Sequence, residues 1–257
     1  MCYHLSSTER RDLYWNNRYH ITTDYTGQLK SYYHVSGFDH PVMNIITSEK
    51  PDEISNYEWG LIPFWVKDAI QADALRKQTI NARNDGIFEK PSFKESILSR
   101  RCIIPVTGFF EWHTKDAKKK FPFYIHLKNE EVFSIGGIYD RWINRITGEV
   151  KSTFSIVTTD ANPMMAAIHN TKLRMPLILP REKELEWIKP DLTKDDITLL
   201  MKPFDENLME AYTISKRITD RKLPNDVPEV LQKFAYPELV DKQDFIAPAK
   251  QKQASLF

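Results

Sequence analysis

The middle of the chain is a succession of short apolar runs that are rich in Ile, Val, Phe and Tyr and separated by polar or Lys-rich turns. Runs of this length and composition are typical of β-strands. The chain has 15 proline but only 8 glycine residues, so the connections between the runs are expected to be stiff. The pattern predicts a mostly antiparallel sheet or barrel, with strands at residues 101–105, 108–113, 122–127, 132–142 and 153–159.

Short helices are predicted between and after these strands. Ser92, with Glu95 three positions later, forms a capping box that marks the start of a helix. Asn162 followed by Pro163 is typical of an N-cap and a first helical position, and this helix should end at His169. The sequence also predicts helices at residues 181–188 and 194–202 and a late strand at residues 212–218.

The chain is expected to form a single α+β domain. It shows no internal repeat, and no linker interrupts it before about residue 235. Beyond that point it becomes polar, rich in Lys and Gln and poor in apolar anchors, which favours a flexible tail. We therefore predict an antiparallel sheet or barrel with flanking short helices over residues 1–235, followed by a tail over residues 236–257.

Charge and composition exclude several classes of function. The chain has 36 basic and 35 acidic residues and a net charge of +1, so binding to nucleic acid through bulk positive charge is not indicated, although a local basic groove stays open. It contains no run of about 18 apolar residues, and its start lacks the charged and apolar blocks of a signal peptide. We expect a cytoplasmic protein that does not contact a membrane.

The chain has two cysteines, Cys2 and Cys102. Two cysteines make no disulfide framework, and no pair of His or Cys residues has a recognisable zinc-ligand spacing. Cys102 lies in the apolar run at residues 101–105 and is expected to be a small buried hydrophobic residue. We therefore expect neither a metal nor a cofactor.

Cys2 directly follows the initiator Met1. Because a small second residue permits removal of the methionine, the mature chain is expected to carry a free α-amine and a thiol on neighbouring carbons of Cys2. Such a 1,2-aminothiol condenses with an aldehyde to an imine, and the thiol then closes a thiazolidine ring. The α-amine has a pKa of about 7.7–8.0 and the thiol one of about 8.5, so both are partly nucleophilic at neutral pH. Taken alone, a second-position cysteine is more often incidental, so the interpretation depends on the rest of the chain.

Three further segments combine unusual residues. They are Trp-Gly-Leu-Ile-Pro-Phe-Trp at residues 59–65 followed by Asn-Ala-Arg at 81–83, Gly-Phe-Phe-Glu-Trp at 108–112, and the stretch from His169 to Arg-Met-Pro at 174–176. In this order, and together with Cys2, the segments resemble the SRAP family, the SOS-response-associated peptidases that process abasic sites. The resemblance covers residues 1 to about 220.

This resemblance implies a function and a set of site residues. In the family, the N-terminal cysteine reacts with the ring-opened aldehyde of an abasic site in single-stranded DNA and forms a stable thiazolidine crosslink that protects the lesion during replication. By resemblance, Cys2 is the nucleophile and Asn81 holds the abasic sugar or the cysteine backbone. Glu111 and His169 would act as general acid and base, and Arg83 would contact DNA phosphate. Reversal of the crosslink, which would release the DNA, fits the same chemistry. A lyase activity would also fit it.

The residues of the Gly-Phe-Phe-Glu-Trp segment support a special role for Glu111. In a strand over residues 108–113, alternation places Phe109, Glu111 and His113 on one face and Phe110 and Trp112 on the other. A carboxylate among aromatic residues is desolvated, so either its pKa rises toward a useful acid–base value or it pairs with a cation such as the N-terminal ammonium. A purely structural ion pair is the alternative.

His169 and the tryptophans Trp59 and Trp65 each have a functional and a structural interpretation. At the end of a helix, the dipole favours the imidazolium form of His169 and thus a proton donor, with a hydrogen-bonded structural histidine as the alternative. Trp59 is expected to pack in the core. Trp65, beyond the proline, is the better candidate for stacking on a base. Arg174 of Arg-Met-Pro is the second expected DNA contact.

The sequence departs from the common family pattern in three places. Tyr3-His4 stands where the family usually has Gly-Arg, which removes one expected basic contact near the lesion. Asp85 stands where a glutamate often follows Asn-Ala-Arg. Residues 170–173 separate His169 from Arg174, where many members have one residue, and this leaves the position of Arg174 relative to the DNA open.

The chain ends in Gln253-Ala-Ser-Leu256-Phe257, which resembles the Gln-x-x-Leu-Phe peptide by which bacterial proteins bind the β sliding clamp. A disordered end is well suited to capture by a partner's groove. The expected partners are therefore single-stranded DNA with abasic sites and a sliding clamp, and we expect a nucleoid-associated monomer. Two other functions stay open: a cysteine peptidase that uses Cys2 with His169, and a noncatalytic DNA or clamp adaptor.

Overall fold

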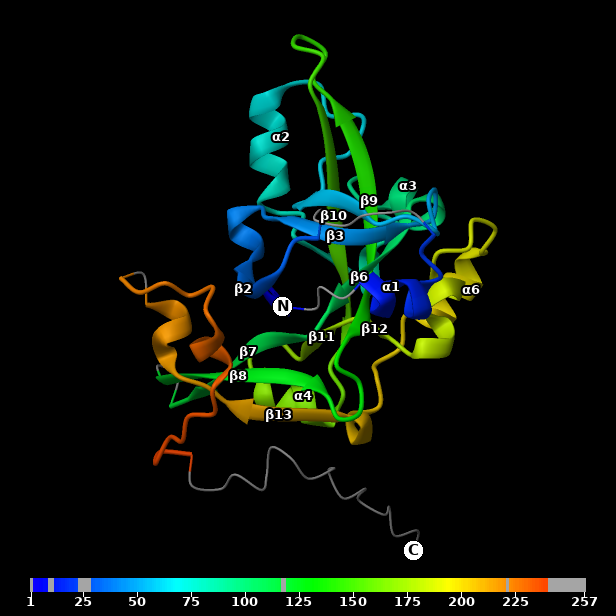
Figure 1. The fold of residues 1–257 in the computed structure, drawn as a ribbon. Coiled ribbons are helices and arrows are strands. Elements are labelled where there is room, and N and C mark those ends of the chain that lie inside the picture. The colour runs from blue at the N-terminus through cyan, green and yellow to red at the C-terminus, as the bar shows by residue number, and fades with distance from the viewer. Residues whose placement is uncertain (1, 9–11, 23–28, 117–118, 221, 240–257) are drawn as a thin grey trace, which may run out of the picture.

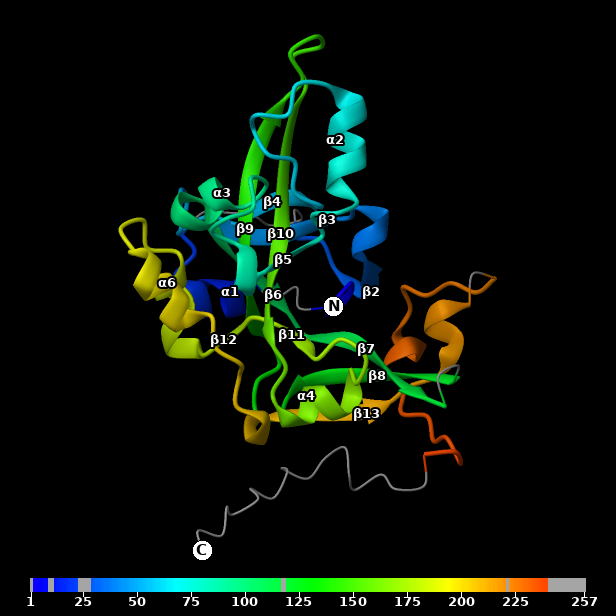
Figure 2. The same cartoon turned by 180° about the vertical axis from the view of Figure 1, so that it is seen from behind.

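Two β-sheets pack against each other, and the beginning of the chain lies between them. The structure is a computed structural model that describes residues 2–8, 12–22, 29–116, 119–220 and 222–239. Figures 1 and 2 both show the start of the chain with β3 and β10 on one side and β7 and β8 on the other. This arrangement puts the N-terminal residues where both sheets contribute to their surroundings.

The strands are β1 (His4–Ser7), β2 (Tyr32–Ser36), β3 (Val42–Thr47), β4 (Ser55–Trp59), β5 (Asn81–Arg83), β6 (Arg101–Val106), β7 (Gly108–Lys115), β8 (Lys119–Leu127), β9 (Phe133–Ile143), β10 (Val150–Asp160), β11 (Arg174–Pro176), β12 (Ile178–Leu179) and β13 (Met209–Thr213). The α-helices are α1 (Asp12–Tyr19), α2 (Ala69–Arg76), α3 (Lys94–Ser99), α4 (Pro163–Ile168), α5 (Glu184–Trp187) and α6 (Lys194–Leu200). The 3-10 helices are η1 (Gly37–Asp39), η2 (Asn84–Gly86), η3 (Arg181–Lys183), η4 (Glu206–Leu208), η5 (Lys216–Thr219) and η6 (Pro228–Leu231).

The smaller sheet has the strand order β13-β8-β7-β1-β2, and each pair of neighbours is antiparallel. In the larger sheet the order β10-β4-β3-β6-β9 closes on itself, because β9 also pairs with β10. This closure makes a barrel, to which β5, β11 and β12 are added. Most pairings are antiparallel, whereas β4 and β5 run parallel to β10. The predicted α+β fold with a mostly antiparallel sheet or barrel is therefore confirmed.

One large apolar core joins the two sheets. Leu5 and Phe109 of the smaller sheet belong to the same buried cluster as Ile104 and Phe154 of the barrel. Alternation along β7 is as predicted, because Phe109 enters this shared core while Phe110 packs in a separate cluster on the other face. The strands that the apolar runs predicted are all present, and several extend beyond the predicted ends by one or more residues.

Two local predictions are wrong. The helix expected from the Ser92–Glu95 capping box begins at Lys94, with Phe93 at its N-cap and no side-chain cap. The amides of Phe93 and Lys94 both donate to the carbonyl of Lys90, at 2.9 and 3.0 Å, so a turn precedes the helix and carries Ser92 away from the cap position.

The late strand also differs, because β13 ends at Thr213, five positions before the predicted end at residue 218. The backbone then turns into η5, where the Ser215 hydroxyl accepts from the amide of Arg217 at 3.2 Å. By contrast, Asn162 caps α4 as predicted and accepts from the amide of Met165 at 2.8 Å.

The packed part of the chain extends past the predicted boundary at residue 235. Tyr236 and Leu239 are buried, and the Tyr236 hydroxyl donates to the carbonyl of Ile214 at 2.8 Å. These two apolar anchors outweigh the polar composition around them. The remainder of the predicted tail, residues 240–257, lies outside the described residues. In the described part of the chain, no helix has the length and apolar character needed to cross a membrane.

Candidate active site

Strand pairing brings the beginning of the chain to Glu111. β1 pairs with β7 so that His4 lies opposite Phe110, and one further step of this register puts Tyr3 opposite Glu111. Cys2 is fully buried, and its thiol lies 3.8 Å from the carbonyl of His4. Burial and then the negative charge of Glu111 raise the pKa of the Cys2 thiol. The thiol and the carboxyl group therefore share one buried electrostatic environment.

Glu111 in turn faces His169. Glu111 is 3% exposed on β7 and His169 is 6% exposed at the C-cap of α4. The Nε2 atom of His169 lies 3.7 Å from Oε2 of Glu111. α4 is held against β7 by His113, whose Nδ1 lies 3.0 Å from the carbonyl oxygen of Ala167 and donates to it. The sheet and the helix thus fix two buried acid–base groups beside each other.

Burial sets the protonation of both groups. It raises the pKa of Glu111 to about 7 and lowers the pKa of His169 to about 4. The rise at Glu111 is one of the two outcomes that the sequence allowed. The prediction that the helix dipole favours an imidazolium at His169 is wrong, because α4 has only 6 residues and desolvation outweighs its dipole.

The tautomer of His169 follows from its second hydrogen bond. Nδ1 lies 3.2 Å from the carbonyl oxygen of Arg174, which only accepts, so the proton is on Nδ1. The lone pair on Nε2 then points toward Glu111. At neutral pH the site holds a neutral imidazole that accepts protons and a carboxyl group close to its titration midpoint.

Asn81 lies on β5 of the barrel, and its side-chain amide has no hydrogen-bond partner among the described residues. β5 runs parallel to β10, with Asn81 opposite Ile156, and Asn81 is 8% exposed. Neither its Oδ1 nor its Nδ2 has a hydrogen-bond partner among the residues that the structure describes. A buried polar group without a partner costs about 1–3 kcal/mol, so such a group in a native protein requires an explanation. A ligand that supplies both a donor and an acceptor would satisfy it.

Gly37 connects the start of β1 with the segment before Asn81. Its amide donates to the carbonyl of Tyr3 at 2.8 Å. A Cβ atom on Gly37 would lie 2.7 Å from a side-chain carbon of Ile80, so only glycine permits this approach. The beginning of the chain is thereby linked through Gly37 to Ile80, the residue before Asn81, and through β1 to β7.

A cavity of about 520 Å³ opens beside the Glu111–His169 pair. Its lining includes Tyr3, His4, Glu111, His169, Lys120 and Lys172. Cys2 is fully buried and does not line the cavity, whereas its neighbour Tyr3 does. The cavity therefore gives a substrate access to the acid–base pair, next to the thiol.

The two arginines expected to contact DNA already have intramolecular partners. Arg83 has a side chain that is 47% exposed, and its Nε donates to Asp85 at 3.0 Å. Arg174 is buried and donates to Asp160 at 3.1 Å and to Asn84 at 2.8 Å. Arg174 thereby joins β11 to the end of β10 and to η2. Arg83 remains accessible, whereas Arg174 is a link within the fold.

The Trp-Gly-Leu-Ile-Pro-Phe-Trp turn exposes a residue that sequence reasoning missed. Trp59 is fully buried, as predicted. Trp65 is half-buried, and its indole N–H donates to the carbonyl of Pro91 at 3.3 Å. Phe64, between them, is 52% exposed. An aromatic residue directly after a proline in a turn was the available signal for Phe64.

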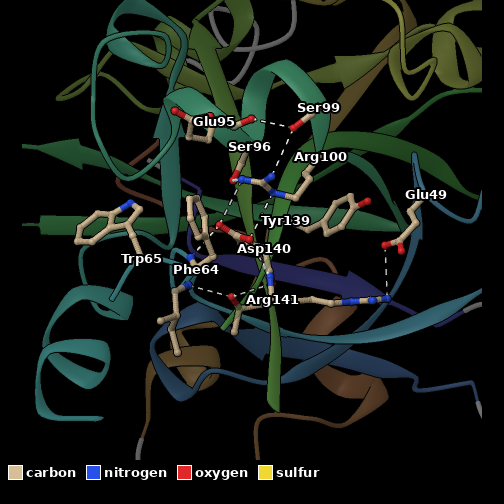
Figure 3. Close-up of polar contacts among 12 residues, drawn as sticks. Glu49, Phe64, Trp65, Glu95, Ser96, Ser99, Arg100, Tyr139, Asp140 and Arg141 are labelled. Atoms are coloured by element: carbon tan, nitrogen blue, oxygen red, sulfur yellow. Dashed lines mark hydrogen bonds and ion pairs between the residues drawn. The ribbon is translucent and has the colours of Figure 1, made fainter. Parts of the chain in front are cut away.

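Figure 3 shows how this turn is held. The amide of Phe64 donates to the buried carboxylate of Asp140 at 3.0 Å, and Asp140 pairs with Arg100 at 3.3 Å. The Arg100 guanidinium lies 5.6 Å from the centre of the Phe64 ring. The ring of Phe64 is therefore presented outward on a rigid support.

The remaining predicted residues are placed as follows. Cys102 is fully buried in the core, as predicted. Gln253, Leu256 and Phe257 lie outside the described residues. The structure thus brings together Cys2, Glu111 and His169, and it links Asn81 to the start of the chain only indirectly, through Ile80 and Gly37. The tail residues stay untested.

A closed barrel packed on an antiparallel sheet, with a buried N-terminal thiol beside an acid–base pair, defines the class of protein. The model of the SOS response associated peptidase (SRAP) family matches residues 1–221. The chain therefore belongs to the SRAP family.

Individual relatives are similar over most of the chain. Identity to abasic site processing protein YoqW of Bacillus subtilis is 38% over 192 residues, which are 74% of this chain and 81% of that protein. Identity to abasic site processing protein HMCES of Pongo abelii is 32% over 205 residues, covering 69% of this chain and 56% of that protein. A crystal structure of a Bacteroides thetaiotaomicron protein superposes with a TM-score of 0.84 at 44% identity, covering 91% of this chain and 100% of that chain.

Proposed function

We propose that this protein recognises abasic sites in single-stranded DNA and captures them covalently through Cys2 after removal of Met1. The observation that carries the proposal is the buried Cys2 thiol beside Glu111, in a domain whose relatives are named abasic site processing proteins. In this role the protein acts in the cytoplasm at the nucleoid and protects the lesion during replication.

The first step opens the abasic sugar. Nε2 of His169 takes the proton of the C1′ hydroxyl, the bond between C1′ and O4′ breaks, and O4′ takes a proton from the Glu111 carboxyl. The neutral imidazole and the raised pKa of Glu111 suit these directions of proton transfer. Asn81 has a free donor and a free acceptor to hold the sugar hydroxyls or the Cys2 backbone.

The second step joins protein and DNA. The Cys2 amine adds to the C1′ aldehyde, and loss of one water gives an imine. The thiol sulfur then bonds to C1′, the electrons of the C=N bond move to nitrogen, and the thiol proton reaches that nitrogen through Glu111. One water leaves in total, and nothing is oxidised or reduced. Because burial keeps the thiol protonated, the amine reacts first.

The same environment disfavours a cysteine peptidase. A peptidase cysteine is activated as a thiolate by a lowered pKa beside a histidine. Here the pKa of Cys2 is raised, and the ring nitrogens of His169 face Glu111 and the carbonyl of Arg174. These contacts support amine-first chemistry and do not support a thiolate–imidazolium pair.

Accessible side chains that do not line the cavity are proposed to guide the strand. Arg83 offers its guanidinium edge to phosphate, and Phe64 and Trp65 lie on a turn suited to base stacking. Arg174 is proposed to act indirectly, by holding η2 and thus Asp85 near Arg83. Reversal of the crosslink would return the free protein.

A denaturing gel with abasic single-stranded DNA tests the proposal. The wild type should give a heat-stable adduct, and Cys102→Ser should give the same amount because that thiol is buried in the core. Cys2→Ala should give none. Cys2→Ser keeps the amine and should give an adduct only after borohydride reduction of the imine. Stable adduct from Cys2→Ala would reject the chemistry, while unchanged DNA binding without any adduct in the wild type would favour a noncatalytic adaptor.

We further propose that the C-terminal Gln253, Leu256 and Phe257 bind a bacterial sliding clamp, with Leu256 and Phe257 in an apolar pocket. The support is the sequence pattern. A peptide of residues 250–257 should bind the clamp of the host at micromolar levels, about −8 kcal/mol or weaker. Calorimetric titration beside a peptide with Leu256→Ala and Phe257→Ala checks this. Equal binding by both peptides would reject the proposal that the tail binds a sliding clamp.

A further inference from the structure

The active-site cavity carries two exposed lysines on its rim. Lys120 lies on β8 directly opposite Thr114 of β7, and Lys172 lies in the segment that lengthens the connection between His169 and Arg174. In the part of the chain that the structure describes, neither lysine forms an ion pair with a carboxylate.

The segment that carries Lys172 is fixed to β7. The side-chain amide of Asn170 brackets the backbone of Thr114, accepting from its amide at 3.1 Å and donating to its carbonyl at 2.9 Å. The amide of Lys172 also donates to the carbonyl of His169 at 3.3 Å. Thr114 is also the partner of Lys120 in the sheet. The hydrogen bonds between Asn170 and Thr114 therefore hold both lysines at the rim of the same cavity.

The other basic side chains near the site either have intramolecular partners or are neutral. Arg83 is paired with Asp85, and Arg174 is buried with Asp160 and Asn84. His4, where the family usually has arginine, is neutral: burial lowers its pKa to about 3, and its Nδ1 lies 2.9 Å from a nitrogen of His34. Among the described residues that line the cavity, the positive charge without a carboxylate partner therefore comes from the two lysines.

We infer that Lys120 and Lys172 form a phosphate subsite that binds the phosphodiester next to the abasic sugar while Glu111 and His169 face the sugar itself. This inference rests on the proposed function. Glu111 is the only carboxylate among the described residues that line the cavity, so the rim attracts anions. Thr114 and Thr171 also belong to this lining and have hydroxyl groups that can donate.

The subsite explains the longer connection between His169 and Arg174. The inserted residues 170–173 bring Lys172 close enough for its charge to contribute, after burial, to the lowered pKa of His169. A phosphate bound there would offset part of that positive charge. The chain thus supplies from a loop after α4 the basic contact that it lacks at position 4.

The test measures binding to single-stranded DNA with a tetrahydrofuran lesion, which lacks the C1′ hydroxyl and cannot crosslink. Fluorescence anisotropy over a salt series compares the wild type with Lys120→Gln, Lys172→Gln and the double variant. Each cation lost from phosphate should reduce the slope of log K against log salt by about 0.7. Lys189→Gln is the matched control, an exposed lysine that lines a separate cavity with Pro51 and Leu185.

A second arm locates the phosphate. A neutral methylphosphonate is placed at the linkage 5′ or 3′ of the lesion. At one of these linkages it should weaken binding by the wild type several-fold and leave the double variant unchanged. Equal slopes for all proteins, or an equal loss at both linkages for wild type and double variant, would overturn the subsite. Because the probe cannot crosslink, a failure of the Cys2 chemistry would not change either readout.

Discussion

Nε2 of His169 lies 3.7 Å from Oε2 of Glu111, and both atoms belong to side chains that are almost fully buried. This separation exceeds that of a hydrogen bond, so a substrate hydroxyl that enters between the two atoms would contact both. Nδ1 of His169 is held by the carbonyl of Arg174, which fixes the ring orientation. The proposed proton transfers to and from a substrate would use these two atoms.

Replacement of this pair should slow capture without loss of binding. Glu111→Gln and His169→Ala should each lower the rate of adduct formation by about 10²–10⁴-fold, the usual contribution of a general acid or base. Single-turnover gel assays measure the rate. Affinity for tetrahydrofuran DNA should stay within about twofold of the wild type, since the same groups contribute little to ground-state binding. Wild-type rates in both variants would contradict the assignment.

Stability should depend on pH through Glu111. Its pKa rises from an ordinary 4.5 to about 7 in the fold, so the native state binds more protons between these values. The stability contributed by the protonated form is complete below pH 4.5 and is lost as the pH rises through 7. The loss amounts to about 3 kcal/mol for a shift of this size.

Glu111→Gln removes that loss. The variant should gain stability relative to the wild type from pH 5 to pH 8, with the larger Tm difference at pH 8. Urea unfolding at several pH values gives the free energy directly. A difference between variant and wild type that does not change with pH would show that burial does not hold the proton on Glu111.

Replacement of Asn81 should affect the free energy of unfolding and the binding of DNA in different ways. Its side-chain amide has no hydrogen-bond partner among the described residues, so Asn81→Leu should leave the free energy of unfolding unchanged or raise it by about 1 kcal/mol. The same change should reduce binding of tetrahydrofuran DNA and slow adduct formation. Thermal unfolding and anisotropy measure the two effects. A marked loss of stability would mean that the amide serves the fold and not a ligand.

Phe64 should contribute to binding of the DNA strand. Its ring is 52% exposed and is supported from behind by Arg100 and Asp140. Stacking of a base on an aromatic ring contributes about 1–3 kcal/mol, so Phe64→Ala should weaken binding of single-stranded DNA by that amount. Phe234, which is 47% exposed and lies against the ring of Tyr236, is the matched control. Equal affinity of Phe64→Ala and Phe234→Ala would dismiss the stacking role.

Strand alternation was sufficient to predict the sheet, and the family motifs pointed to Glu111 and His169, which the structure places close together. The period of two along 108–113 placed Phe109 and Glu111 on one face, as the structure confirms for Phe109 in the shared core. The burial of Cys102 and Trp59 also followed from their apolar neighbours. These features depend on local pattern, which a single sequence contains.

Features that depend on distant partners were not predictable. The protonation of His169 is decided by desolvation between α4 and β7, and a sequence shows the helix end but not its burial. The pairing of Arg174 with Asp160 and Asn84 requires the register of β11 on β10. The hydrogen bond from the Tyr236 hydroxyl to the carbonyl of Ile214 likewise joins two segments of the chain. No periodicity in the sequence indicates that these segments are in contact.

Intact-protein mass spectrometry after incubation with an abasic single-stranded oligonucleotide tests the central claim most directly. We predict a species with the mass of the chain from Cys2 onward plus the oligonucleotide minus one water, with the modification located at Cys2 by fragmentation. A protein that retains a blocking extension on the Cys2 amine should give no such species. Stable adduct on the blocked protein, or a crosslink at any other residue, would contradict the thiazolidine account.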